Sequence, residues 1–357
     1  MSVSKWISDC ETRGAGSPVR SFVVGLGRAG AGLHLPVLAK LRERTPKLFD
    51  DHPVVACEPR ETVVSRPGLV ITPTLHEAAD GLCPADTIVH ICTPPTQRLA
   101  VLSDLAALGF RKMIVEKPLT TDIDDLARIV RLRRKYKLHI EVVEPWLASS
   151  LTKRLVELLR GGRFGAAKSI DIVQNKPRFR RSLVRPGHPT AFDVELPHGV
   201  ALALRLAGAA RVTHASGTDL EVEGNVGPRM GGAAVGLRHN SGVHTEIRSD
   251  LTSPVRERRV TVEFEQGSAV GHFAVSGDDH HSQLTLCSNG RSEHVVLRDD
   301  AMTEWMFEAY RKFQLDGEQT QGFTFATEVV RLLSVAKNIC AEPVTSPEPD
   351  AVASHAG

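Results

Sequence analysis

A glycine-rich hexapeptide near the start of the chain is the first segment whose residue types and spacing suggest chemistry. It reads Gly25-Leu26-Gly27-Arg28-Ala29-Gly30 and follows an apolar run that begins at Ser21. A strand, a tight glycine turn and a helix in this order bring backbone N–H groups and a helix N-terminus to a diphosphate. We therefore predict a dinucleotide site with contacts from Gly25, Gly27, Arg28, Ala29 and Gly30. The alternative is a turn with a structural role only.

An acidic residue, Glu58, ends the second predicted strand, Val54–Cys57. A carboxylate in this place accepts hydrogen bonds from the ribose hydroxyls of the adenosine and repels a 2′-phosphate. Arg60, two residues further on, would instead bind that phosphate. The sequence therefore predicts NAD as the preferred cofactor and NADP as the alternative. Glu58 and Arg60 could also do no more than solvate the end of a strand.

Lys117 follows another predicted strand, Lys112–Val115, within the run Glu116-Lys117-Pro118-Leu119. Doubly wound sheets bind ligands beyond the carboxyl ends of their strands, which is where this lysine falls. A desolvated ammonium group stabilises the negative charge that develops on the oxygen of a secondary alcohol during hydride transfer. We predict that Lys117 is catalytic and that Glu116 helps to position the nicotinamide or its ribose. A lysine on a surface loop is the alternative.

His198 is the candidate general acid and base, because its ordinary pKa lies near neutrality. It closes the run Phe192-Asp193-Val194-Glu195-Leu196-Pro197-His198. We expect Asp193 or Glu195 to orient the imidazole or to contact substrate hydroxyls. The alternative is a histidine packed as the cap of the helix that follows.

Three further side chains are candidates for the substrate pocket. Arg178 and Arg181 belong to the basic segment Lys176–Arg185, and their guanidinium forks suit carboxylates or phosphates. That segment could equally be a solvated strand edge. Trp146 would form a wall of the pocket or belong to the core. His280-His281 has no third ligand at a recognisable spacing, so we predict no metal site.

Two stretches of different texture must position these residues. Residues 18–146 alternate short apolar runs with helical patterns, which predicts an α/β doubly wound Rossmann domain with a parallel sheet. It includes a helix over Asp122–Tyr136, capped by Thr121 and Asp124. Residues 147–343 carry short β-type runs with turn residues between them, which predicts an α+β domain with a large, mostly antiparallel sheet. A helix over Phe325–Ile339 closes it, and 1–17 and 344–357 are expected to be flexible tails.

Composition restricts the class of protein. The chain has 357 residues, of which 41% are hydrophobic, and this is enough for a sizeable core. Its net charge of +2 is too small a basic bias for a nucleic-acid-binding protein, so we expect no nucleic-acid partner. No apolar run approaches the roughly 20 residues that cross a bilayer, so we expect no membrane partner. The 6 cysteines are scattered without a Cys-x-x-Cys pair, which favours reduced thiols and a cytoplasmic protein.

Taken in order, these motifs resemble the Gfo/Idh/MocA family, the relatives of glucose–fructose oxidoreductase and inositol dehydrogenase, over nearly the whole chain. The resemblance rests on the glycine loop, Thr93-Pro94-Pro95, Glu116-Lys117-Pro118 and His198 before an apolar helix. It implies an NAD(P)-dependent oxidoreductase that interconverts a secondary alcohol and a ketone on a sugar, cyclitol or related polyol derivative. It also implies that Thr93 and Pro94 contact the cofactor, that Lys117 contacts the reacting oxygen, and that the chain forms a homodimer or homotetramer through its C-terminal sheet.

The chain departs from the family pattern at two places. Val194 stands four residues before His198, where many members have aspartate, and Glu144-Pro145-Trp146 replaces a frequent Asn-Arg pair. Two other functions therefore stay open. One is a ketone or imine reductase of a biosynthetic pathway, and the other is a non-catalytic sensor that binds the dinucleotide.

Overall fold

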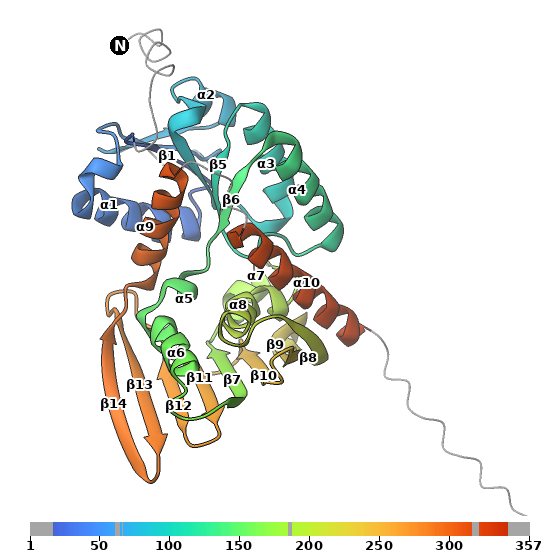
Figure 1. Ribbon diagram of the computed structural model, residues 1–357. Helices are drawn as coiled ribbons and strands as arrows, with labels where there is room; N and C mark the ends of the chain where they lie inside the picture. Colours follow the sequence, from blue (N-terminus) through green and yellow to red (C-terminus); the bar gives the residue numbers. More distant parts are fainter. Residues whose placement is uncertain (1–16, 61–64, 66, 185–187, 316–320, 342–357) are drawn as a thin grey trace, which may run out of the picture.

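A computed structural model describes residues 17–60, 65, 67–184, 188–315 and 321–341. The predicted tails fall almost entirely outside these described residues. The chain forms two sheets with helices around them, and its last two helices lie against both parts (Figure 1).

The first sheet is parallel throughout, with strand order β3-β2-β1-β4-β5-β6. This is the doubly wound order that the sequence predicts. The central strands are continuous apolar runs because helices cover both faces of the sheet. The strands are β1 (Arg20–Val24), β2 (Val54–Cys57), β3 (Leu69–Thr72), β4 (Thr87–Ile91), β5 (Lys112–Val115) and β6 (His139–Val142). The helices between them are α1 (Leu35–Arg44), α2 (Leu75–Ala79), α3 (Arg98–Ala107) and α4 (Ile123–Tyr136).

The cap of α4 differs from the predicted one. Asp122 is the N-cap, and its carboxylate accepts hydrogen bonds from the backbone N–H groups of Asp124 and Asp125. Its extended backbone, with φ of −122°, brings the carboxylate over these two donors. The pairing of Thr121 with Asp124 was therefore the wrong prediction.

The second sheet is antiparallel except for one pair, β7 with β10, as the sequence predicts. Its order is β14-β13-β12-β11-β7-β10-β9-β8. The strands are β7 (Ala167–Asn175), β8 (Ala210–Val222), β9 (Asn225–His239), β10 (His244–Asp250), β11 (Glu257–Phe264), β12 (Ser268–His272), β13 (His281–Ser288) and β14 (Arg291–Arg298). Asn289 and Gly290 turn β13 into β14 with positive φ angles of 51° and 72°.

Short helices connect the sheets and cover the inner face of the second one. They are α5 (Pro145–Ala148), α6 (Ser150–Gly161), α7 (Phe179–Val184) and α8 (Leu196–Ala207). Apolar side chains of α6 and α8, such as Leu155 and Val200, belong to one core cluster with strand residues such as Ile172 and Val260. The interior of this part is thus a helix layer against a sheet.

The two last helices tie the parts together. In α9 (Ala301–Gln314), Trp305, Met306 and Tyr310 pack into the core on one face of the first sheet. In α10 (Gln321–Ala341), Phe323 and Val330 belong to the core on the other face, while Leu332, Leu333 and Ala336 belong to the core of the second part. The predicted C-terminal helix is confirmed and is longer. The sequence pattern did not reveal α9, β3 or α2.

One expectation about the cysteines was wrong. Cys57, Cys92, Cys287 and Cys340 are free thiols, but Cys83 is disulfide-bonded. Bonding requires two sulfur atoms to meet in space, which scattered positions in a sequence neither predict nor exclude.

No helix within the described ranges combines the length and the apolar character that crossing a membrane would require.

The bridging role of α10 predicts a clear difference between two neighbouring substitutions. Leu333 is 2% exposed, whereas Val335 on the same helix is 37% exposed. Leu333→Ala leaves a cavity in the core and should lower the free energy of unfolding by about 2–5 kcal/mol. Val335→Ala should change it by no more than about 0.5 kcal/mol. Chemical denaturation measures both, and equal losses would mean that α10 does not hold the core as described.

Candidate active site

The glycine loop connects β1 to the helical segment that continues into α1. Gly25 has a φ of +91°, which favours glycine. A Cβ atom on Gly30 would lie 2.0 Å from the carbonyl oxygen of Gly25, so only glycine fits where helix and strand meet. A Cβ atom on Gly27 would meet nothing within 4 Å. The loop therefore has open space beside its second glycine, where the predicted diphosphate approaches the backbone.

Glu58 lies directly against this loop. Its carboxylate accepts a hydrogen bond from the backbone N–H of Leu26 at 2.7 Å. The guanidinium of Arg60 donates to the same carboxylate from Nε at 2.8 Å and from Nη2 at 2.9 Å. The hydrogen bonds from Arg60 lower the pKa of Glu58 below its ordinary value. Glu58 is buried while the Arg60 side chain is half exposed, so the exposed charge at this place is the cation.

Thr93 and Pro94 follow β4 on the other side of the loop. Thr93 lies 3.3 Å from the position of a Cβ atom on Gly25, and its buried Oγ1 has no hydrogen-bond partner in the part of the chain that the structure describes. Arg98, at the start of α3, is buried and donates to the carbonyl oxygens of Thr93 and Lys117 at 3.2 and 3.5 Å. The sequence analysis did not single out Arg98, because its position at the start of a helix resembles that of any exposed arginine.

A pocket of about 520 Å³ lies between the two parts of the chain. Arg28, Ala29, Glu116 and Lys117 line it from the first part. From the second part it is lined by residues that include Trp146, Lys176, Arg181, His198 and Arg258. The pocket thus brings together the glycine loop, the predicted catalytic lysine and the predicted catalytic histidine.

Lys117 is half-buried at the end of β5, and its ammonium group donates a hydrogen bond to the carbonyl oxygen of Val194. The peptide bond between Lys117 and Pro118 is cis. Burial lowers the pKa of Lys117 to about 8, although the charges of Glu116 and Glu144 oppose this shift. A lysine in such a state exchanges its proton near neutral pH.

Glu144 is the acidic partner of His198 among the described residues. The Nδ1 atom of His198 lies 3.0 Å from Oε2 of Glu144. Burial, together with the charges of Lys117 and Arg258, lowers the pKa of His198 well below its ordinary value. Burial also raises the pKa of Glu144 well above its ordinary value, against the opposing charge of Lys117. Both shifts favour a neutral imidazole at pH 7.

The expectation that Asp193 or Glu195 orients His198 was therefore wrong. Asp193 forms an ion pair with Lys337 at 3.0 Å and closes a capping box with Thr190. Glu195 contacts Lys176 and accepts a hydrogen bond from the amide of Gln174. Both acids point to partners on other elements because helix α8 begins between them and His198.

Trp146 forms part of the pocket wall and is also buried, at 6% exposure. Its ring stacks on His198 at 5.6 Å and on Phe273 at 4.2 Å between centroids. Of the two predicted arginines, Arg181 lines the pocket, whereas Arg178 is buried and donates to Ser182 at 3.2 Å. Burial and the charges of Arg181 and Arg28 lower the pKa of Arg178 to about 10.

A chain of buried side chains lies behind Glu116. The Nε2 atom of His34 is 2.9 Å from Glu116, its Nδ1 is 2.8 Å from His90 Nδ1, and His90 Nε2 is 2.7 Å from the Tyr310 hydroxyl. Tyr310 in turn meets Ser21 at 2.7 Å. Burial alone would lower the pKa of His34, but Cys92 and Glu116 raise it to about 10, while burial lowers the pKa of His90. His34 is thus the charged donor to both neighbours, and no sequence signal linked these residues.

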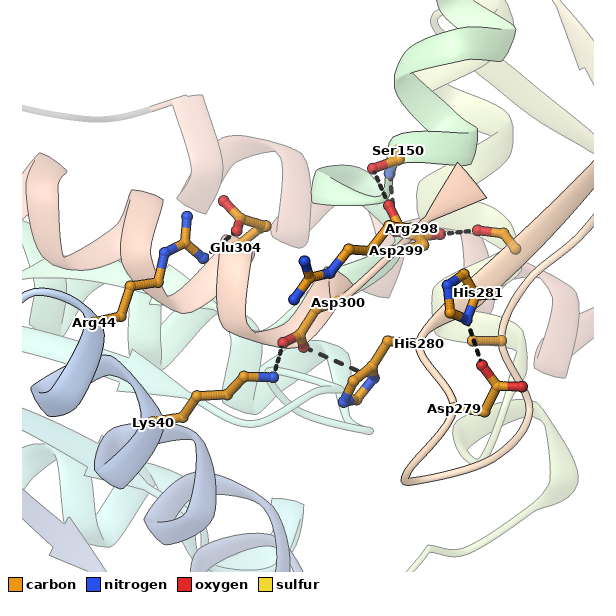
Figure 2. A network of polar contacts seen from close by, with 12 residues as sticks. Lys40, Arg44, Ser150, Asp279, His280, His281, Arg298, Asp299, Asp300 and Glu304 are labelled. Carbon is orange, nitrogen blue, oxygen red and sulfur yellow. Dashed lines mark hydrogen bonds and ion pairs between the residues drawn. The ribbon is translucent and has the colours of Figure 1, made fainter. Parts of the chain in front are cut away.

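The rim of the pocket is tied to the first part through Asp300. Figure 2 shows Asp300 between Lys40 of α1 and His280, which precedes β13. Asp299, beside it, accepts hydrogen bonds from Ser149 and from the backbone N–H of Ser150 at 2.9 Å.

Within the described ranges, no group of three or more His, Cys, Asp or Glu residues could hold a metal ion.

No protein-family model and no curated protein matches the chain. Solved structures do match it. A 3-ketoreductase from Actinomadura kijaniata, in complex with NADP and TDP-benzene, has a TM-score of 0.75 at 15% identity over 91% of this chain and 98% of its own. An NAD binding oxidoreductase from Klebsiella pneumoniae has a TM-score of 0.75 at 12% identity over 91% and 97%. A candidate NADPH-dependent oxidoreductase from Desulfitobacterium hafniense has a TM-score of 0.75 at 15% identity over 90% and 96%. At these identities the likeness establishes the two-part α/β fold.

The contact between Gly30 and Gly25 predicts a difference between two glycines of one helical segment. Gly30→Ala forces the loop away from the helix and should lower the free energy of unfolding by about 1–3 kcal/mol. Gly32→Ala adds a methyl group where nothing lies within 4 Å. It should leave stability unchanged or raise it by up to about 1 kcal/mol. Thermal and chemical unfolding test this, and a Gly30→Ala protein as stable as Gly32→Ala would contradict the close packing.

Proposed function

We propose that the protein is an NAD(P)-dependent oxidoreductase of the Gfo/Idh/MocA type. It interconverts a secondary alcohol and a ketone on a sugar, cyclitol or related polyol derivative. The observation that carries the proposal is that Lys117 and His198 line one pocket with Arg28 and Ala29 of the glycine loop, and that Glu144 is hydrogen-bonded to His198. The names of the structural neighbours, a 3-ketoreductase among them, agree with this chemistry.

The residues around the glycine loop fit a dinucleotide. Gly27 faces open space, and the buried hydroxyl of Thr93 has no hydrogen-bond partner among the described residues. Arg28 lies at the start of the helical segment, where the N–H groups and a cation would both meet a diphosphate. Pro94 and Glu116 would complete the wall next to the nicotinamide.

The Glu58–Arg60 pair weakens the argument for NAD. Arg60 occupies both carboxylate oxygens of Glu58, so ribose hydroxyls would have to displace it. The exposed guanidinium is instead suited to a 2′-phosphate. We infer that the enzyme uses NADP at least as well as NAD.

Replacing Arg60 tests this choice of cofactor. Arg60→Ala removes the cation and frees the Glu58 carboxylate, which would then repel the 2′-phosphate. The KM for NADP should rise about tenfold or more, while the KM for NAD stays level or falls. Steady-state kinetics or calorimetry with both dinucleotides measures the ratio. An unchanged preference in Arg60→Ala would contradict the role given to this residue.

The bound dinucleotide would accept or donate the hydride. The proposed mechanism requires Glu144 to be ionised, which the charge of Lys117 favours, so that it accepts a hydrogen bond from Nδ1–H of His198. The free Nε2 of His198 then accepts the proton of the substrate hydroxyl in the oxidative direction. The ammonium of Lys117 stabilises the negative charge that develops on the same oxygen. Reduction follows the same path backwards, with His198 returning the proton.

The reaction should depend on the charge of Lys117. Its pKa of about 8 means that the ammonium form is present below that pH and is lost above it. We expect kcat/KM to be level over roughly pH 6 to 7 and to fall about tenfold per pH unit well above pH 8. Lys117→Ala should lower kcat about 10²- to 10⁴-fold. Lys117→Arg keeps the charge at all accessible pH values, so its lower rate should show no such fall.

The assay follows reduced nicotinamide during incubation with polyols, cyclitols and amino sugars, with Lys112→Ala, at the opposite end of β5, as the control. Turnover that survives Lys117→Ala would overturn the role of this lysine. Tight dinucleotide binding without turnover on any alcohol, ketone or imine would favour the sensor instead. Turnover with imines alone would favour the imine reductase.

A further inference from the structure

The pocket carries more positive than negative side chains. Its acidic lining residues are Glu116, Asp299 and Asp300. Its basic lining residues are Arg28, Lys117, Lys176, Arg181, Arg256 and Arg258. Whether this excess is real depends on the contacts that each charged group makes.

The acidic residues are engaged elsewhere. Glu116 is bound by His34, as described above. Asp300 pairs with Lys40 of α1, and Asp299 accepts from Ser282 as well as from the two serines at the start of α6 (Figure 2). Within the described residues, none of these carboxylates forms an ion pair or a hydrogen bond with a lysine or arginine that lines the pocket, although the charge of Glu116 acts on Lys117 and Asp300 lies near His280. The three carboxylates therefore leave most of the positive charge of the lining unbalanced.

Four lining side chains come from one face of two neighbouring strands. In the register of β7 with β11, Gln174 lies opposite Arg258, and Asn175 lies opposite Glu257. Lys176 and Arg256 are the next residues outward, so alternation puts Gln174, Lys176, Arg256 and Arg258 on the same face. This face is the floor of the pocket.

The two arginines on this floor do not use all of their N–H donors in hydrogen bonds to the described residues. Arg258 donates to the carbonyl oxygen of Ala274 at 2.7 Å, and Arg256 donates to that of Val275 at 3.1 Å. These are the contacts recorded for the two guanidinium groups among the described residues, and neither is to a carboxylate. Lys176 is the one cation of the floor with an acidic contact, Glu195. A guanidinium that binds a single carbonyl keeps most of its donors for a ligand.

We propose that the substrate is an anion, whose carboxylate or phosphate group binds Arg258 and Arg256 in the pocket that Lys117 and His198 also line. This inference rests on the proposed function, because it assumes that the pocket holds the reacting molecule. Arg28 lies in the glycine loop and would serve the cofactor diphosphate, so the substrate anion is a second, separate negative charge. Arg258 lies near the start of β11 and Arg256 lies just before it, so both arginines are at the end of this strand that lines the pocket.

The electrostatics of the pocket agree with this assignment. Burial and the charge of Arg256 lower the pKa of Arg258, and Arg258 and Lys176 contribute to the lowered pKa of His198. Like charges held together in a desolvated site repel one another. An anionic group between them would remove that repulsion and would bind through charge-assisted hydrogen bonds.

A titration with three matched probes tests the proposal on the full-length chain. Glucose, glucuronate and glucose 6-phosphate share one ring and differ in charge, and calorimetry is run with and without NADP. We expect at least one anionic probe to bind about tenfold or more tightly than glucose. Tighter binding of glucuronate would identify a carboxylate, and tighter binding of glucose 6-phosphate would identify a phosphate.

Arg258→Gln should remove this difference between charged and neutral probes, and Arg258→Lys should restore part of it. Arg259→Gln is the matched control, because Arg259 is the next residue on β11 and binds Glu257 and Thr261 away from the pocket. Equal binding of all three probes, or equal losses in Arg258→Gln and Arg259→Gln, would overturn the inference. Dinucleotide binding by the wild-type chain separates the cases. If the wild-type chain binds the dinucleotide but shows no preference for an anionic probe, only this inference fails, whereas a wild-type chain that binds no dinucleotide refutes the proposed function. Intact dinucleotide binding by Arg258→Gln shows that this variant is folded.

Discussion

Partial burial of the Lys117 side chain is the constraint on which the rest of the site depends. An ammonium group that loses much of its contact with water is costly unless nearby groups compensate it. Here the carbonyl oxygen of Val194 accepts its hydrogen bond, and the Glu116 carboxylate, whose pKa is lowered, supplies negative charge. Val194 belongs to the second part of the molecule, so this one hydrogen bond already requires both parts to be in place.

The compensating carboxylate of Glu116 needs support in turn. Glu116 stays ionised because His34 donates to it, and His34 is held from its other side by His90 and then Tyr310. Tyr310 lies on α9, which follows the last strand of the second sheet in the sequence. The end of β5 is therefore supported by a helix much later in the sequence, since His90 and Tyr310 are 220 residues apart. Helix α10 packs into the cores of both parts, and α9 packs against the first sheet while its Glu308 binds Lys153 of α6. These contacts hold the two walls of the pocket relative to each other.

The same reasoning explains the distribution of charge. The first part supplies the glycine loop and Lys117, and the second part supplies His198 and the basic floor. A pocket assembled in this way can keep the residues of one part while the residues on the floor change. Fold likeness at 12–15% identity is compatible with such divergence, because the fold constrains the frame and leaves the floor free.

The sequence by itself determined the two sheets, the glycine loop and the place of Lys117 and His198, because periodicity, turn residues and the positions after strands are local properties. The spacing of Gly25 and Gly30 predicts close packing of the helix against the strand, and the structure has this packing. Only the tertiary structure decided that Glu144, 54 residues away, is the partner of His198 in place of Asp193 or Glu195. It also decided that His34, Arg98 and Arg258 reach the site. These residues come together through strand register and the packing of the two parts, which no local pattern records.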